Sequence, residues 1–142
     1  MAKKARDIMT PDPECVGEND SVLDAAKRLA ELDVGAMPIC GEDNRLKGML
    51  TDRDIVVKVL AQGKDPGSTK AGELGQGDGQ TVTIGADDSV EEALRTMIDH
   101  KVRRLPVIDG HDLVGIVSQA DIATNLDEAK VGDLVEAISA AP

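Results

Sequence analysis

Two stretches of the chain, GMLTDRDIVV at Gly48–Val57 and GIVSQADIAT at Gly115–Thr124, follow the same pattern 67 residues apart. In each stretch an apolar strand pattern ends in a hydroxyl residue, which is followed by two spacer residues and an aspartate. Earlier Ser-Val pairs and prolines also recur in matching order, at an offset of 68 residues. The chain therefore consists of a unit of about 60 residues that occurs twice. The two copies are expected to share one fold, so each motif is considered in both.

Within each copy, a helix is expected between short strands. The segments NDSVLDAAKRLAELD and DDSVEEALRTMIDH carry apolar residues at helical spacing, and Asp88 or Ser89 supplies the N-cap of the second. The turns GEDN and DGHD are rich in Gly, Asp and Asn, which favours hairpins. The expected strands are 14–16, 36–40 and 46–50 in the first copy and 81–84, 105–108 and 113–117 in the second, with further helices starting at Asp52 and Gln119.

The order of these elements predicts the fold class. A strand–helix–strand crossover makes the first two strands parallel, and the tight turn makes the next pair antiparallel. Since a copy of about 60 residues buries too little surface to be comfortably stable alone, the copies are expected to pack with pseudo-twofold symmetry. We predict an α/β fold of two β-α-β-β-α units: residues 1–62 with an N-terminal lead-in, a connector 63–80, the second unit 81–126 and a C-terminal helical segment 127–142.

Composition excludes several classes of partner. The chain has 142 residues, a formal net charge of −11 and no Phe, Tyr or Trp. Such a chain repels a phosphate backbone and offers no ring for base stacking, so nucleic acid is not an expected partner. No apolar run of about 18 residues is present, and the N-terminus lacks the apolar core of a secretory signal. We expect a cytoplasmic protein without a membrane partner.

The motifs together resemble a known family. Each copy has a lead-in like DIM, an S-V-x-x-A helix, an apolar-Pro-apolar strand and a G-h-h-[TS]-x-x-D ending, where h is apolar. From about Ala5 to Asn125 the chain resembles two cystathionine-β-synthase-type (CBS) domains forming one Bateman module, as in the stand-alone CBS pairs of actinobacteria. The resemblance implies clefts between the two units for an adenosine-containing ligand such as AMP, ATP or S-adenosylmethionine. It also implies a homodimer, although many members bind no demonstrable ligand.

The repeated hydroxyl and aspartate allow two interpretations. Thr51 with Asp54, and Ser118 with Asp121, have the form of a capping box, in which each pair satisfies amides at the start of a helix. The functional interpretation uses the same geometry, because phosphate binds where helix amides are unpaired. By the resemblance, Thr51 and Ser118 become phosphate contacts, while Asp54 and Asp121 become ribose contacts. Capping and binding are compatible.

The two copies differ where phosphate charge must be met. Arg103 and Arg104 precede a strand of the second copy, where the first copy has glycine and alanine. Forked guanidinium groups suit phosphate oxygens, but these residues also fit a solvated basic patch or pairs with acidic neighbours. Arg53 is expected to reach a phosphate from the opposite unit. Without aromatic rings, adenine would lie between aliphatic side chains; the candidates are Val16, Met37 and Pro38 in the first copy and Val82 and Pro106 in the second.

The remaining reactive residues do not form a catalytic motif. Cys15 and Cys40 lie near the ends of two parallel strands, so either a buried reduced pair or a disulfide fits the pattern. A zinc site from the cysteines with His100 and His111 has weak support, and no metal or required cofactor is expected. No nucleophile and base are paired, so we expect a regulatory module rather than an enzyme, acting on an unknown target protein. The alternative is a ligand-free stress-response or protein-interaction module stabilised by the disulfide.

Overall fold

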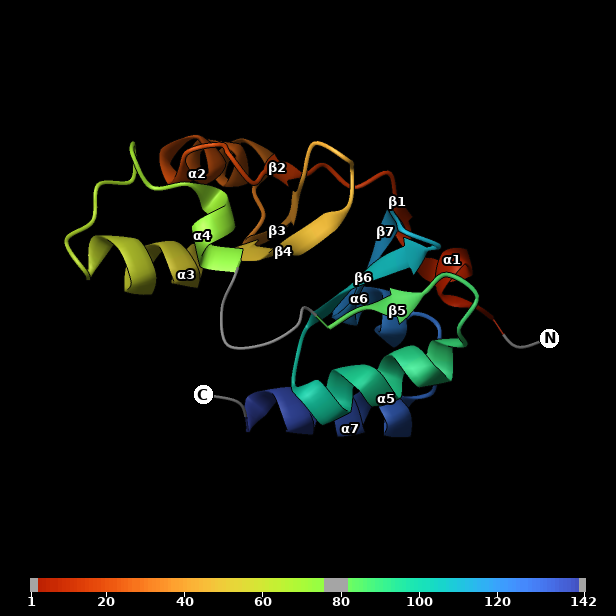
Figure 1. The fold of residues 1–142 in the computed structure, drawn as a ribbon. Helices are drawn as coiled ribbons and strands as arrows, with labels where there is room; N and C mark the ends of the chain where they lie inside the picture. The colour runs from red at the N-terminus through yellow and green to blue at the C-terminus, as the bar shows by residue number, and fades with distance from the viewer. Residues whose placement is uncertain (1–2, 76–81, 141–142) are drawn as a thin grey trace. The chain divides into compact units, whose positions relative to one another are not determined.

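The computed structural model describes residues 3–75 and 82–140 and divides them into two compact units (Figure 1). The first-repeat unit is drawn from Glu14–Thr81, and the second-repeat unit combines Met1–Pro13 with Val82–Pro142. Each unit has its own sheet and its own apolar core. Residues 76–80 of the expected connector, and Thr81 at the start of the expected second unit, lie outside the described residues.

The first-repeat unit is built on a three-stranded sheet with the order β2-β3-β4. Strand β2 runs parallel to β3, and β3 runs antiparallel to β4. This confirms the parallel and antiparallel pairs that the crossover and the hairpin predicted. The elements are β2 (Val16–Gly17), α2 (Val22–Leu32), β3 (Ala36–Cys40), β4 (Leu46–Thr51), α3 (Asp52–Asp54), the π-helix η1 (Ile55–Leu60) and α4 (Ala71–Gly75).

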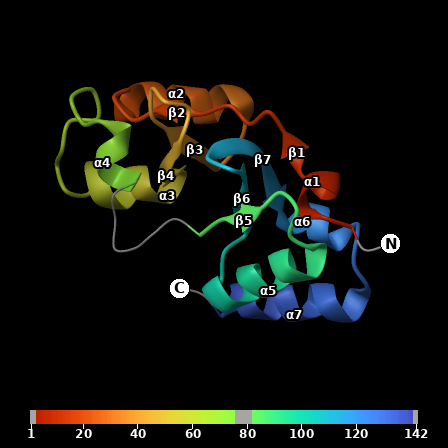
Figure 2. The ribbon, with the colours of Figure 1, turned by 45° about the vertical axis from the view of Figure 1, so that its right-hand side comes forward.

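The second-repeat unit repeats this plan with one additional strand. Its sheet has the order β1-β7-β6-β5, in which β5 and β6 are parallel and the other neighbours antiparallel. Helices α5 and α7 lie side by side in both views (Figures 1 and 2). The elements are α1 (Ala5–Ile8), β1 (Thr10–Pro11), β5 (Ile84–Gly85), α5 (Val90–His100), β6 (Arg104–Asp109), β7 (Asp112–Ser118), α6 (Gln119–Ala123) and α7 (Glu128–Ser139).

The two amphipathic helices begin where their sequence predicts. Ser89 caps α5, because its hydroxyl accepts the amide of Glu92 at 3.1 Å, and Ser21 caps α2 in the same way. Asp88, the alternative cap, instead accepts the amide of Gly85 at 2.9 Å. The serine therefore satisfies a helix amide, and the preceding aspartate closes the turn between strand and helix.

The first strand of each copy is shorter and starts later than expected. Strand β2 pairs with β3 only at Val16 and Gly17, whereas the expected strand began two residues earlier. The carbonyl of Cys15, just before β2, accepts a hydrogen bond from the guanidinium of Arg28. In the second copy the pairing likewise covers only the two residues of β5, and the structure offers no physical account of its late start.

The lead-in packs against the second copy, although the expected boundaries placed it with the first. In α1, the amide of Ala5 donates to the carbonyl of Asp88 at 2.8 Å, and β1 pairs with β7. Helix α4 takes the equivalent place in the first-repeat unit, where the amide of Ala71 donates to the carbonyl of Asp20 at 2.8 Å. Both alanines are fully buried. The N-terminal lead-in thus completes the core of the second copy with Ala5, whereas α4, which precedes the second copy in the sequence, completes the core of the first with Ala71.

Charge and close packing hold the lead-in in place. The guanidinium of Arg6 lies 2.9 Å from the carboxylate of Asp87 and 3.4 Å from that of Asp109. The hydrogen bond and positive charge of Arg6 lower the pKa of Asp87, and the same pair raises the pKa of Arg6. A Cβ added to Gly115 would come within 2.3 Å of Met9 Sδ and 3.0 Å of the carbonyl oxygen of Thr10, so a side chain at this position requires the lead-in to shift.

Aliphatic residues and methionines make up both core clusters. No helix within the described residues combines the length and the apolar character that crossing a bilayer requires. The largest fully buried side chains are Val16, Val22, Ile39, Leu50 and Val59 in the first-repeat unit and Met97, Leu105, Pro106, Val107, Val117, Ile122 and Leu134 in the second-repeat unit.

Candidate functional site

The first capping box joins the end of β4 to α3. The hydroxyl of Thr51 accepts the amide of Asp54 at 3.0 Å, and the Asp54 carboxylate accepts the amide of Thr51 at 3.1 Å. The other carboxylate oxygen of Asp54 lies 3.4 Å from the ammonium of Lys58. One oxygen of Asp54 is therefore hydrogen-bonded and the other is ion-paired within this unit.

The second capping box joins the end of β7 to α6. The amide and the hydroxyl of Ser118 both donate to Asp121 Oδ2, at 2.8 and 3.0 Å. In the described part of its own unit, Asp121 Oδ1 has no donor and no cation lies within 4.0 Å of the carboxylate. Asn125 lies at the position that matches Lys58. Its side-chain amide donates to the backbone carbonyl of Asp121 at 2.7 Å and not to the Asp121 carboxylate.

The capping interpretation is thus confirmed for both boxes, while their binding of a ligand stays a prediction. A capping box needs only the hydroxyl and the carboxylate, and both pairs are half-buried at the junction of strand and helix. Neither Lys58 nor Asn125 was predicted from the sequence to take part in a box. Each lies four residues after the aspartate, and this helical spacing is the signal that would have identified them.

The arginine pair lies at the start of β6, the strand that pairs with the end of β7 at the second box; the sequence predicted both arginines just before this strand, and Arg104 is its first residue. Arg104 is the direct register partner of Ser118, and the carbonyl of Arg103 accepts the amide of Gln119 at 2.9 Å. Both arginine side chains are exposed, and within residues 3–75 and 82–140 neither has a carboxylate within 4.0 Å. The alternative in which they pair with acidic neighbours is therefore not seen in the described residues. Arg53 is likewise exposed.

The strand that faces the first box has small residues, Gly35 and Ala36, at the positions that match the two arginines. Ala36 is the register partner of Thr51, and the carbonyl of Gly35 accepts the amide of Asp52 at 3.0 Å. Asp52 also accepts the amide of Arg53 with its own carboxylate, at 2.8 Å. Where the second box has two arginines and a neutral glutamine, the first box has two small residues and a carboxylate.

The residues proposed to surround adenine are mostly core residues. Val16 and Met37 belong to the core cluster of the first-repeat unit, with exposures of 0% and 2%. Pro38 and Pro106 are buried, and Val82 is half-buried against the core of the second-repeat unit. Packing alone explains these residues, and their contact with adenine stays a prediction.

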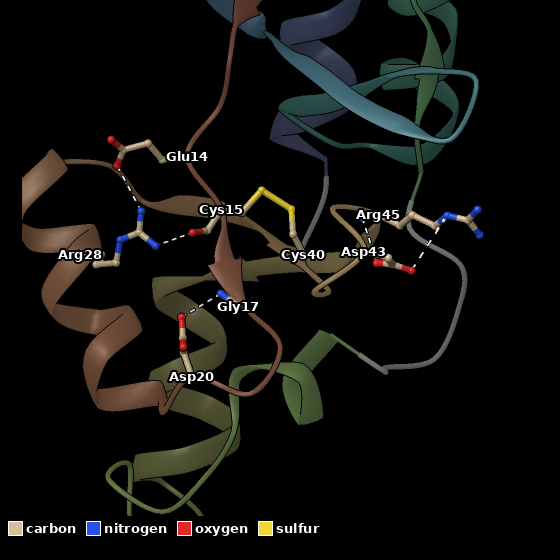
Figure 3. Close-up of a disulfide and its surroundings, with 8 residues drawn as sticks. All are labelled: Glu14, Cys15, Gly17, Asp20, Arg28, Cys40, Asp43 and Arg45. Atoms are coloured by element: carbon tan, nitrogen blue, oxygen red, sulfur yellow. Dashed lines mark hydrogen bonds and ion pairs between the residues drawn. A yellow bond between two sulfur atoms is a disulfide. The ribbon is translucent and has the colours of Figure 1, made fainter.

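The two cysteines form a disulfide in the first-repeat unit (Figure 3). The Cα atoms of Cys15 and Cys40 are 5.7 Å apart, at the beginning of β2 and the end of β3. The bridge is one of the two states that the sequence left open. Arg28 contacts the chain next to the disulfide. Its guanidinium donates to the carbonyl of Cys15 and lies 3.2 Å from the carboxylate of Glu14.

A protein-only metal centre is not evident. Within the described residues, no three side chains of His, Cys, Asp or Glu are grouped so that they could hold a metal ion. His100 and His111 are both exposed. The disulfide also removes both thiolates, which would be the strongest zinc ligands of the chain.

The two matched boxes, each at the end of a hairpin strand, define a tandem repeat module, and comparison with known proteins identifies its class. The model of the CBS domain matches residues 5–61 and 79–128, and the chain belongs to the CBS domain family. This family is generally regulatory and non-catalytic. The expected resemblance to tandem CBS domains is confirmed.

Among individual proteins, the chain is similar to Hypoxic response protein 1 of Mycobacterium tuberculosis, with 51% identity over 134 residues that cover 94% of this chain and 92% of the relative. A crystal structure of Hypoxic Response Protein I with two coordinated zinc ions aligns with a TM-score of 0.81 and covers 88% of this chain and 100% of that one. A crystal structure of CBSX2 in complex with AMP has 25% identity and a TM-score of 0.73, covering 85% of this chain and 93% of that one.

Proposed function

We propose that the chain is a regulatory module that binds an adenosine-containing ligand through its capping boxes. The observation that carries the proposal is Asp121 Oδ1, which has no donor within the described part of its unit, in a box whose neighbouring strand starts at two exposed arginines without a carboxylate partner there. A carboxylate accepts hydrogen bonds from ribose hydroxyls, and guanidinium groups donate to phosphate. The related CBSX2 is known in complex with AMP, which supports this ligand class.

In this proposal the hydroxyl residues Thr51 and Ser118 contact phosphate, and Asp54 and Asp121 contact ribose. Arg103 and Arg104 meet the phosphate charge at the second box, and Arg53 supplies a further cation. The adenine ring contacts the aliphatic residues Val16, Met37, Pro38, Val82 and Pro106.

Calorimetric titration of the chain with AMP, ADP, ATP, NAD and S-adenosylmethionine tests this function. We expect at least one adenosine phosphate to bind, and Asp121→Asn to weaken that binding. Asp127→Asn is the matched control, because Asp127 also caps a helix, by accepting the amide of Lys130 at 2.9 Å, but stands outside both boxes. No heat with any ligand at millimolar concentration contradicts the proposal, and so does an equal loss in both variants.

A second candidate is a ligand-free stress-response or protein-interaction module. The disulfide and the similarity to Hypoxic response protein 1 favour it, because neither feature requires a small ligand. The same titration separates the two candidates. A chain that binds none of the five ligands, yet keeps its bridge and its folded state, is what this alternative predicts.

We also propose that the chain forms a homodimer through the π-helix η1. Val56, Val57 and Leu60 are exposed there by 55%, 43% and 55%, while Ile55 and Val59 are buried. Exposed aliphatic residues grouped on one helix are typical of an association surface. Light scattering is expected to give a dimer that Leu60→Asp dissociates. The control, Val135→Asp, introduces the same charge on α7, where 43% of the residue is exposed, and a monomeric wild-type chain contradicts the proposal.

The proposed location is the cytoplasm, and the disulfide gives this proposal a direct test. Disulfides persist mainly in oxidising compartments, whereas cytosolic thiols are usually reduced. Cell fractionation combined with thiol counting on freshly lysed cells is the measurement. Recovery of the chain in a non-cytoplasmic fraction contradicts the proposed location. Two free thiols in the cytoplasmic fraction would show that the chain is reduced in the cell and that the bridge forms only on later oxidation.

A further inference from the structure

The two capping boxes have the same backbone plan but different charged residues around it. Asp52 in the first box corresponds to Gln119 in the second, and Lys58 corresponds to Asn125. The carbonyls of Gly35 and Arg103 accept the amides of Asp52 and Gln119 at 3.0 and 2.9 Å, which shows that the positions match in structure as well as in sequence.

The carboxylate that would bind ribose is engaged in the first box and available in the second. Asp54 has one oxygen on the amide of Thr51 and the other 3.4 Å from Lys58. Asp121 has both of its donors from Ser118 on a single oxygen, and its Oδ1 has no donor in the described part of its unit. A ribose hydroxyl therefore competes with an ammonium group at Asp54 but not at Asp121.

The charge that would face phosphate also differs. Asp52 brings a carboxylate to the first box, at the position where the second box has neutral Gln119. Across the strand pair, Ala36 faces Thr51, whereas Arg104 faces Ser118. The first box also carries Arg53 where the second has Ala120, so Asp52 offsets a nearby cation, whereas Arg103 and Arg104 at the second box meet neutral Gln119. A dianionic phosphate is therefore held more weakly at the first box than at the second.

We propose that Asp52 and Lys58 are specificity-determining residues that close the first box to a phosphorylated nucleoside, so that the chain binds one adenosine phosphate, at the second box. This inference rests on the proposed function and adds to it the stoichiometry and the residues that set it. Lys58 acts by occupying Asp54, and Asp52 acts by repelling phosphate.

Each effect is modest because the groups are at the surface. The side chains of Asp54 and Lys58 are 22% and 47% exposed, and exposed ion pairs of this kind change an equilibrium about two- to fivefold. A single surface charge near phosphate has an effect of similar size. Exchanging both residues is therefore expected to change affinity roughly tenfold.

The inference is tested by exchanging the matched residues of the two boxes in variants that retain only one box. Calorimetry measures the binding of AMP and of adenosine to each variant. In Asp121→Asn, which retains only the first box, Asp52→Gln and Lys58→Asn together should tighten AMP binding roughly tenfold. In Asp54→Asn, which retains only the second box, Gln119→Asp and Asn125→Lys together should weaken it roughly tenfold. Far-UV circular dichroism confirms that every variant is folded.

The two residues are separated by their response to the phosphate. Asp52→Gln alone should improve AMP binding and leave adenosine binding unchanged, whereas Lys58→Asn alone should improve both. If Lys58→Asn weakens AMP binding, Lys58 is a phosphate ligand and the inference is wrong. It is also wrong if the wild-type chain binds two equivalents of AMP with equal affinity, although the proposed function then stands. If the wild-type chain binds no adenosine-containing ligand, the proposed function itself fails, and this inference fails with it.

Discussion

Removing the disulfide is expected to destabilise the first-repeat unit by about 3.5 kcal/mol. Cys15 and Cys40 are 25 residues apart in sequence, and the chain-entropy relation for closing a loop of that length gives this value at 25 °C. The bridge joins Cys15, just before β2, to Cys40 at the end of β3. Its loss therefore removes the covalent link that closes the segment containing β2, α2 and β3.

The assay is urea unfolding of the variant in which both cysteines are replaced by alanine. Because the chain contains no Phe, Tyr or Trp, unfolding must be followed by far-UV circular dichroism rather than by fluorescence. With a slope of about 1–3 kcal/mol per molar urea, the loss moves the midpoint down by roughly 1.2–3.5 M. Alanine is chosen because Cys40 is only 5% exposed and a polar replacement would add its own cost.

Reductant provides the matched control. It should destabilise the wild-type chain by nearly the same amount as the double replacement and leave the double variant unchanged. A thiol-reactive probe should find no free thiol in the denatured, unreduced wild-type chain. A loss below about 1 kcal/mol, or an equal effect of reductant on both proteins, would refute the entropic reasoning.

Three further perturbations test the second-repeat unit. Because Arg6 lowers the pKa of Asp87, this carboxylate stabilises the fold at neutral pH and loses its contribution as the pH falls through the lowered value, below the ordinary 3.8. Asp87→Asn should therefore reduce the difference in urea midpoint between pH 7 and pH 3, and an undiminished difference counts against the pair. Ser89→Ala should cost about 1 kcal/mol in urea unfolding, since it removes the cap of α5, and no measurable loss would show that the cap is replaced by water. Gly115→Ala should cost about 1–3 kcal/mol, because the added Cβ collides with the lead-in. The control is Gly132→Ala, which should stabilise α7 by about 0.5–1 kcal/mol, since no atom lies within 4 Å of the added Cβ. Equal effects of the two substitutions would contradict the close packing at Gly115.

Local patterns explain why so much of the fold was predictable. The helices α2 and α5 follow from the spacing of apolar residues and a serine cap, both of which act within a few residues of sequence. The hairpins follow from turn residues, and Asn44 and Gly110 indeed adopt a left-handed backbone with φ of 62° and 64°. The capping boxes were predictable for the same reason, because hydroxyl and carboxylate act over three residues.

Interactions between distant residues explain what was missed. Nothing local tells which copy receives the lead-in, because its place depends on Ala5 filling a core built from residues after Val82. The choice between reduced and bridged cysteines depended on whether two strands are neighbours, which only tertiary structure decides. The π-helix η1 was not predicted either, since its apolar pattern continues an ordinary helix from α3.

The duplication itself separates folding from function in this chain. Residues that both copies share, such as Thr51 with Ser118, are accounted for by capping, so their presence alone is weak evidence for a ligand. Residues that differ at matched positions, such as Lys58 and Asn125, are not required by the common fold, because each copy folds with its own choice. Any chemistry that belongs to one unit alone must therefore be encoded in these differences, and a charge exchange between matched positions tests function while preserving the fold.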